Sequence, residues 1–195
     1  DNNPIVVSCA TNGTCATVGQ WSTLLVNGAG APTGVRWTTT TANSVAISII
    51  RESGNSLVFG SCATISGCDA TAEFGWNTIS TTSTAPSRTR LADSTNIYRR
   101  YVTRFGSLVA VGICDDSYIW GCTDPDQWTT LTLGRVDTTY GFSANIYEKN
   151  DETWVAWQSL NETTIAYCAS NCLRRESWTV SPSFRNNNLR EGNFN

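Results

Sequence analysis

Short apolar runs bounded by polar turn residues recur along the whole chain, and runs of this length predict β-strands. No segment has a convincing helical period, and 94–104 has the weakest strand pattern. Additional strands are expected at 34–39, 45–50, 142–147 and 154–157, with turns at 53–55 and 149–151. The pattern therefore predicts an all-β protein.

Four of the apolar runs share one layout: a strand ending in Cys, a short polar loop, a second Cys, and a Trp that opens another strand. The first cysteines are 53, 52 and 54 residues apart, which indicates an internal repeat of about 52 residues. Its hairpins lie near 4–26, 56–80, 108–133 and 163–180. With the strands between hairpins, each period holds about four short strands, as one propeller blade does. We expect one β-propeller-like domain, 1–195, whose repeat tryptophans cover the seam to the next unit: Trp21, Trp76, Trp128 and Trp178.

Eight cysteines, an even number, point to an oxidising compartment. We expect a local disulfide in each hairpin loop, worth roughly 2–3 kcal/mol because the closed loops are short. The predicted pairs are Cys9–Cys15, Cys62–Cys68, Cys114–Cys122 and Cys168–Cys172. The third unit leaves a second alignment open, in which Cys114 lies on the preceding strand. Zinc is disfavoured, because its cysteine ligands usually form two close pairs.

The hairpin unit resembles the Asp-box hairpin of sialidase-type propellers, Ser-x-Asp-x-Gly-x-x-Trp. It also resembles secreted bacterial repeat proteins with a C…C…W-T-x-x-x-V blade signature, as in 122–133. The resemblance covers the four hairpins, about half of the chain, and implies blade architecture. The Asp and Gly of the Asp-box are missing here, so a disulfide would replace the hydrogen bonds of that motif.

Charge and composition narrow the partners. The net charge of -3 and the pI near 4.9 argue against nucleic acid, and no apolar run is long enough for a membrane helix. The chain has no His, so the usual general base and zinc ligand are missing. We expect no metal and no cofactor. A secreted location is expected from the cysteines, from the start at Asp1 and from two N-glycosylation sequons, at Asn12 and Asn161.

The phase of the repeat bears on assembly. The chain starts at the third strand of a unit, so four hairpins alternate with only three connecting segments. Three outcomes are open: a four-bladed ring with a trimmed first blade, strands donated by a neighbouring copy, or a piece of a longer array. Donated strands would cover open sheet edges and produce a homo-polymer.

A glycan-cleaving enzyme would need two carboxylates facing each other across a pocket. Asp115, Asp116, Asp124, Asp126, Glu148 and Glu152 are the available carboxylates. The loop aspartates are interpreted as turn residues, with calcium conceivable at Asp124 and Asp126. A sialidase would also need an arginine cluster, for which no motif selects among Arg36, Arg51, Arg90, Arg99 and Arg100. Neither a Gly-x-Ser-x-Gly elbow nor a free cysteine is evident, so we predict no enzyme.

Aromatic residues outside the repeat motif are the stronger functional signal. The candidate glycan-binding residues are Trp37, Trp120, Trp154 and Trp157. Trp154 and Trp157 are three residues apart on one predicted strand, so one should be buried and the other exposed. The main hypothesis is a non-catalytic extracellular binding or adhesion domain directed at glycans. The alternative is a structural subunit of a filament or coat that assembles by strand exchange between copies, and a glycan-cleaving enzyme is a remote third.

Overall fold

The computed structural model describes residues 5–9, 21–25, 34–39, 45–62, 75–92, 99–114, 122–149, 152–160 and 162–185. For 5–9, 21–25, 34–39, 45–47 and 62 it describes the backbone alone. Within these ranges the regular structure is β-strand apart from two short 3-10 helices. The predicted all-β class is therefore confirmed.

The strands coincide with the apolar runs of the sequence. In chain order they are β1 (Ile5–Cys9), β2 (Trp21–Leu25), β3 (Gly34–Thr39), β4 (Val45–Ser53), β5 (Ser56–Cys62), β6 (Gly75–Thr81), β7 (Pro86–Leu91), β8 (Arg99–Phe105), β9 (Leu108–Cys114), β10 (Trp128–Arg135), β11 (Phe142–Lys149), β12 (Glu152–Ser159), β13 (Glu162–Cys168), β14 (Thr179–Val180) and β15 (Phe184–Arg185). The 3-10 helices are η3 (Pro125–Gln127) and η4 (Arg175–Ser177). The four additional strands expected from the sequence lie within β3, β4, β11 and β12.

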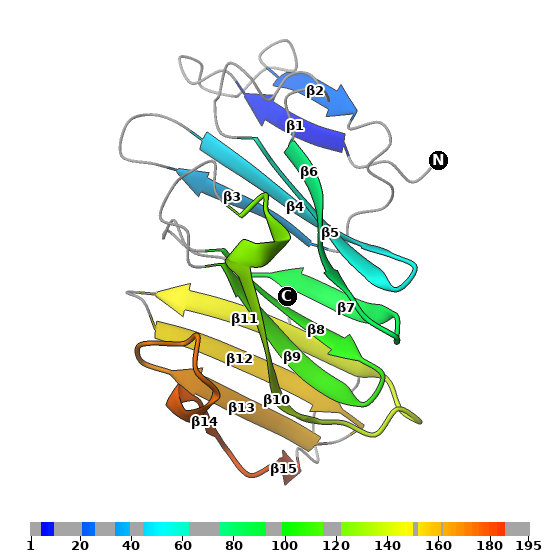
Figure 1. The fold of residues 1–195 in the computed structure, drawn as a ribbon, viewed down its shortest axis with the longest axis vertical. Helices are drawn as coiled ribbons and strands as arrows, with labels where there is room; N and C mark the ends of the chain where they lie inside the picture. The colour runs from blue at the N-terminus through cyan, green and yellow to red at the C-terminus, as the bar shows by residue number, and fades with distance from the viewer. Residues whose placement is uncertain are drawn as a thin grey trace.

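Successive strands pair antiparallel, which gives a ladder β1–β2 and three sheets, β3–β6, β7–β10 and β11–β14. β15 pairs with β13 beyond β14. The sheets follow one another in chain order along the long axis, with β1–β2 at one end and β11–β15 at the other (Figure 1). The structure thus repeats a four-stranded unit, and its described strands form no closed ring.

Disulfides close the hairpin loops of the last two units. Cys114 is bonded to Cys122 and Cys168 to Cys172, with Cα atoms 5.7 and 5.8 Å apart. Cys114 ends β9 and pairs with Trp128 at the start of β10, so it does not lie on the preceding strand. The other two predicted pairs, Cys9–Cys15 and Cys62–Cys68, lie outside the described residues because Cys15 and Cys68 do.

The spacing from second cysteine to tryptophan has a direct cause. The indole N–H of Trp128 donates a hydrogen bond of 2.9 Å to the carbonyl of Cys122. Trp178 makes the same bond, also 2.9 Å, to the carbonyl of Cys172. In both units a 3-10 helix lies between the second cysteine and the tryptophan. The indole therefore folds back over this loop. In these two units the contact spans the six residues from the second cysteine to the tryptophan.

Hydrophobic cores lie between consecutive sheets. The core between β3–β6 and β7–β10 contains Ile50, Leu57, Phe59, Ile79, Leu91, Tyr101, Cys114, Cys122 and Trp128. The core between β7–β10 and β11–β14 includes Val102, Val109, Val111, Ile113, Leu133, Phe142, Ala144, Ile146, Val155, Trp157, Ala166 and Trp178. The middle sheet, β7–β10, therefore buries alternate side chains of its strands against the sheets on its two sides.

The tryptophans cover a different seam from the one predicted. The rings of Trp128 and Phe59 have centroids 5.2 Å apart, and Phe59 belongs to the preceding unit. Trp178 likewise lies in the core shared with the preceding sheet. The prediction that the tryptophans cover the seam to the next unit was wrong for both. The reason is that each disulfide loop packs backward, η3 against β6 and η4 against β10.

Two adjacent arginines explain why the strand pattern is weak at 94–104. Arg99 and Arg100 open β8 but are only 3% and 5% exposed. Arg99 faces the preceding sheet and donates a 3.1 Å hydrogen bond to Ser48, whereas Arg100 faces the next sheet and contacts Glu148 at 3.1 Å. Buried charges are tolerated here because each has a partner across a seam.

Candidate functional site

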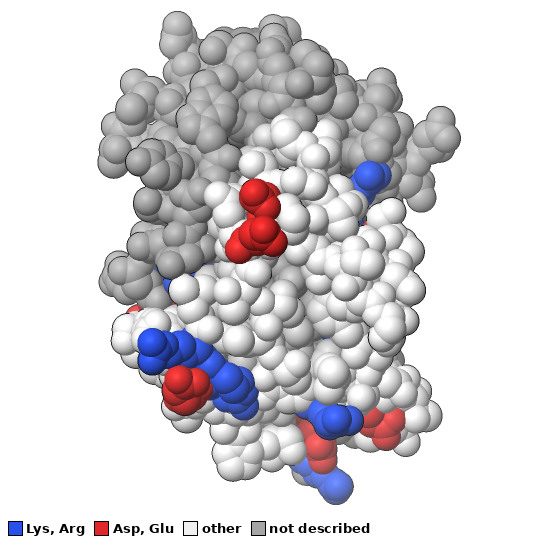
Figure 2. Space-filling model, in the orientation of Figure 1, with Lys and Arg blue, Asp and Glu red and all other residues white. Residues whose placement is uncertain are grey.

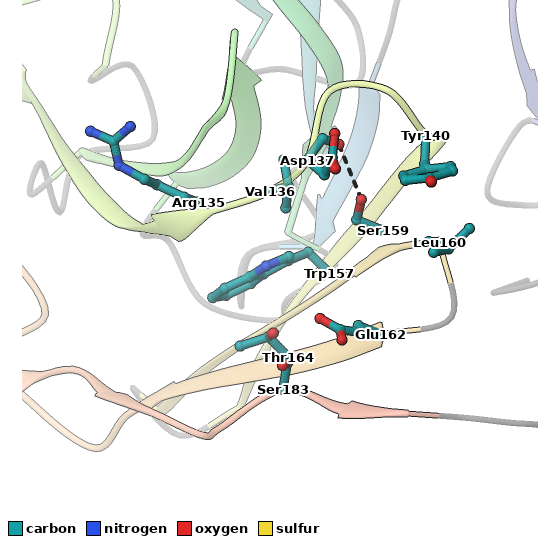
Figure 3. A pocket seen from close by; sticks show the side chains of 10 residues that line it. All are labelled: Arg135, Val136, Asp137, Tyr140, Trp157, Ser159, Leu160, Glu162, Thr164 and Ser183. Carbon is teal, nitrogen blue, oxygen red and sulfur yellow. Dashed lines mark hydrogen bonds between the residues drawn. The ribbon is translucent and has the colours of Figure 1, made fainter.

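A cavity of about 270 Å³ opens at the end of the seam between β7–β10 and β11–β14. It forms where the segment after β10 and the turn from β12 to β13 meet, with the segment before β15 along one side (Figure 3). Its volume is just below the roughly 300–1,000 Å³ of pockets for drug-sized ligands. The lining residues are Arg135, Val136, Asp137, Tyr140, Trp157, Ser159, Leu160, Glu162, Thr164 and Ser183.

Trp157 forms the floor of the cavity. Its side chain is 4% exposed, and in the strand register it stands between Ala144 and Thr164. Gly134 on β10 makes room for the indole, because a Cβ at that position would lie 2.9 Å from the ring. The ring is therefore packed between two sheets and almost fully covered.

Polar groups surround this floor. The Asp137 carboxylate accepts a 2.8 Å hydrogen bond from the Thr139 backbone N–H, and this bond lowers the pKa of Asp137. The Ser159 hydroxyl donates to the Asp137 carbonyl at 3.2 Å and ties the loop after β10 to the end of β12 (Figure 3). Glu162 pairs with the exposed Arg185 at 3.6 Å. The wall thus holds one ionised and one ion-paired carboxylate.

The rim is apolar and open. Tyr140 is 43% exposed and Leu160 is 42% exposed, and both stand at the mouth beside the carboxylates (Figure 3). The accessible aromatic surface of the cavity is therefore Tyr140 rather than Trp157. An aromatic ring beside convergent oxygens suits a ligand that presents both C–H surface and hydroxyl groups.

The geometry gives little support for acid–base catalysis at this cavity. A general acid working near neutral pH needs a raised carboxyl pKa, whereas the Asp137 pKa is lowered by its hydrogen bonds. In the described ranges, no three His, Cys, Asp or Glu side chains lie close enough together to hold a metal ion.

The structure separates the two tryptophans of β12, as predicted. Trp157 is buried in the cavity floor, whereas Trp154 is 42% exposed on the opposite face of the sheet. Trp37 lies on β3, described by its backbone alone, and Trp120 lies outside the described residues. Neither sequon asparagine, Asn12 or Asn161, is in the described part of the chain. Of the two candidate tryptophans whose side chains are described, Trp157 lines the cavity and Trp154 does not.

The repeat tryptophans of the first two units are less fully defined. Trp21 starts β2 opposite Cys9, with its backbone alone described. Trp76 is partly exposed and lies over Gly60 of the paired strand, where an added Cβ would come within 2.5 Å of the ring. The Arg51 guanidinium lies 5.8 Å from the centre of the same ring. Trp76 thus packs on its own hairpin.

The described carboxylates among those available to a glycan-cleaving enzyme are spread over separate elements of the fold. Asp124 caps η3 by accepting a 3.0 Å hydrogen bond from the Asp126 N–H, as turn residues do, and Figure 2 shows acidic side chains over this helix. Glu148 is buried against Arg100, and Glu152 is hydrogen-bonded to Tyr167. The loop pair Asp115 and Asp116 lies outside the described residues.

An arginine cluster is equally unsupported where side chains are described, because Arg99 and Arg100 point to opposite faces of β8. Sequence reasoning missed Asp137, Ser159 and Glu162. They sit at strand ends that meet only after two sheets have packed, and no spacing along the chain marks them.

No helix in the described ranges is long and apolar enough to cross a membrane. No protein-family model matches the sequence, and neither a curated protein nor a solved structure is significantly similar to it.

Proposed function

We propose that this protein is a non-catalytic, extracellular carbohydrate-binding domain whose ligand occupies the cavity between β10 and β12–β13. The observation that carries the proposal is the combination of an exposed Tyr140 ring with the Asp137 carboxylate and the Ser159 hydroxyl around one small cavity. A sugar ring offers an apolar C–H face and several hydroxyls, and these groups match both parts of the cavity.

Carbohydrate fits this chemistry better than the other small-ligand classes. A purely apolar ligand would displace water from the Asp137 carboxylate without replacing the hydrogen bonds that the water makes, and this loss costs free energy. An anionic ligand would be repelled by Asp137 and Glu162, although Arg135 also lines the cavity. Neutral hydroxyls can donate to both carboxylates, so a neutral sugar residue is the preferred ligand.

An extracellular location and blade-like repeats belong to the same proposal. Two closed disulfides support an oxidising environment. The first strands of successive sheets lie next to one another, since β7 packs against β3 and against β11, as the inner strands of propeller blades would. On the described surface in Figure 2, uncharged side chains fill the area between a few groups of charged ones, which suits an uncharged ligand or surface.

A glycan array followed by calorimetric titration of the best ligand tests this function. Tyr140→Ala and Asp137→Asn should each weaken binding roughly tenfold, because each removes one contact of about 1.4 kcal/mol. Asn can still accept the hydrogen bond from Thr139, so the loop should keep its shape. Trp154→Ala is the matched control, an exposed aromatic on the same sheet but outside the cavity.

The outcomes separate the possible sites. Loss of binding in the two cavity variants with full binding in Trp154→Ala supports the proposal. Loss in Trp154→Ala alone would place the sugar on the opposite face of the sheet and overturn the cavity. Absence of any glycan ligand on the array and in titration would reject carbohydrate binding itself.

A further inference from the structure

A row of three aromatic side chains crosses the face of β11–β14 that points away from β7–β10. Tyr147, Trp154 and Tyr167 stand opposite one another on β11, β12 and β13, and we call them the aromatic row. The Trp154 and Tyr167 rings have centroids 4.1 Å apart, and the Tyr167 hydroxyl is hydrogen-bonded to Glu152. Tyr147 is 52% exposed and Trp154 is 42% exposed. The row is an ordered apolar surface facing solvent.

The corresponding positions in the preceding unit are buried. Trp154 pairs with Tyr167, the residue just before Cys168. In the preceding unit, Arg100 pairs with Ile113, the residue just before Cys114. Ala92 completes that earlier row, bonded through its N–H to the Arg100 carbonyl at 2.8 Å. Ala92, Arg100 and Ile113 are 0%, 5% and 3% exposed, because β11–β14 covers them.

The unit before that shows the same arrangement. Ser48 pairs with Ser61 at the equivalent register, and they are 1% and 6% exposed beneath β7–β10. The middle residue of each covered row contacts the next unit at an equivalent residue, the one that pairs with the first cysteine of that unit. Ser48 accepts a hydrogen bond from Arg99, and Arg100 donates one to Thr153. In both seams whose side chains the structure describes, this face is therefore a docking surface for the next unit.

We propose that the aromatic row docks a second copy of this chain, head to tail. The end of that copy formed by β1–β2 would take the place that the next sheet takes in the two seams within the chain. The two ends lie at opposite extremes of the stack (Figure 1), so a contact between the row of one copy and the β1–β2 end of the next could repeat along a series of copies. Because this contact joins two different surfaces, it repeats from copy to copy and gives a filament or a larger ring.

The side chains of the row suit a contact between molecules. Within the chain the covered rows carry serine, alanine, isoleucine and an arginine, all of them buried in the folded chain. Tyr and Trp tolerate both water and burial, and they are enriched where protein surfaces associate. The row is separate from the carbohydrate cavity, which opens at the end of the other seam of this sheet.

Sedimentation velocity of the full chain over a wide concentration series tests the proposal, with Trp154→Arg as the disrupting variant. Phe184→Arg is the matched control, since Phe184 is an aromatic 46% exposed on β15 and outside the row. Trp154→Arg should raise the dissociation constant for association by roughly 30-fold or more, as loss of a central aromatic anchor does. Phe184→Arg should leave it unchanged. Equal thermal unfolding and intact disulfides establish that each variant folds, and Tyr147→Arg replaces Trp154→Arg if that variant does not.

Mixing separates the geometries. A head-to-tail contact predicts species larger than a dimer in wild type. Trp154→Arg added to wild type should shorten these species. The β1–β2 end of the variant can still bind the aromatic row of a wild-type copy, but its own row cannot bind the next copy. A wild type that stays monomeric, or that stops at a dimer formed row to row, would overturn the proposal. So would association that survives Trp154→Arg. Glycan binding by the cavity can hold or fail independently of each result.

Discussion

Arg100 is the residue whose removal should damage the seam between β7–β10 and β11–β14 most. Its guanidinium lies 3.1 Å from the Glu148 carboxylate and also donates to the Thr153 hydroxyl, so it joins β8 to β11 and β12. The side chains of Arg100 and Glu148 are 7% and 0% exposed. Replacing Arg100 with Met fills a similar volume but leaves Glu148 buried without this cation.

Removing one partner of a buried ion pair costs about 3–5 kcal/mol, much of it the desolvation of the remaining charge. For a chain of 195 residues this is a fall in melting temperature of roughly 6–20 °C. Urea unfolding followed by tryptophan fluorescence measures the change in the free energy of unfolding. The double variant Arg100→Met, Glu148→Leu should regain most of the loss, because an apolar pair of similar size is tolerated at such positions.

Arg104→Met on the same strand is the control. Arg104 is partly exposed, lies 5.2 Å from the Phe142 ring and donates a 3.0 Å hydrogen bond to Ser87, so its loss should cost about 1 kcal/mol or less. If Arg100→Met is no more destabilising than Arg104→Met, the buried pair does not hold the seam. Additive losses in the double variant with Glu148→Leu would refute the desolvation argument.

Three other changes probe the hairpin loop and the core. Replacing Cys168 and Cys172 with Ala should lower the free energy of unfolding by about 2 kcal/mol, the chain-entropy value for so short a loop; an unchanged urea midpoint would show that the bridge adds nothing. Trp178→Phe keeps an aromatic ring but leaves the Cys172 carbonyl without its donor, so thermal unfolding should report a loss of about 1–3 kcal/mol, and wild-type stability would contradict this role. Burial raises the pKa of Tyr101 to about 12, so the folded chain keeps a proton that the unfolded chain releases near pH 10. The contribution of Tyr101 to the free energy of unfolding should therefore be complete below pH 10 and fall by about 2–3 kcal/mol as the pH rises to 12. Unfolding measured over this alkaline range should show a smaller decline in Tyr101→Phe; an equal decline in both proteins would contradict this role of Tyr101.

Much of the fold could be predicted because the residues of the repeat have strong local preferences for strands, turns or disulfide-closed loops. Apolar runs and turn residues predicted β3, β4, β11 and β12, and the cysteine and tryptophan intervals predicted a unit that the structure repeats. The opposite orientations of Trp154 and Trp157 followed from the period of a strand. These features depend on neighbours along the chain, which a single sequence contains.

The remaining features depend on packing between sheets. Nothing in the period of the repeat tells which neighbour a tryptophan covers, so the seam of Trp128 was assigned to the wrong side. The strand at Arg99 and Arg100 looked weak because arginine is mostly exposed, and its burial requires partners from two other sheets. The cavity joins Asp137 on one side of a seam to Glu162 on the other, and only the packed structure brings such strand ends together.

Because the hydrophobic cores lie between consecutive sheets, unfolding of one sheet affects the stability of the adjoining sheets directly. In the described part of the chain, each seam couples two adjoining units, so total stability is a sum of unit and seam contributions, as in solenoid proteins. A defect at Arg100 would weaken one seam and leave intact the one centred on Tyr101 and Phe59. Under tension along the stack, the weakest seam would then part first, while the disulfide-closed hairpins on either side keep their local shape.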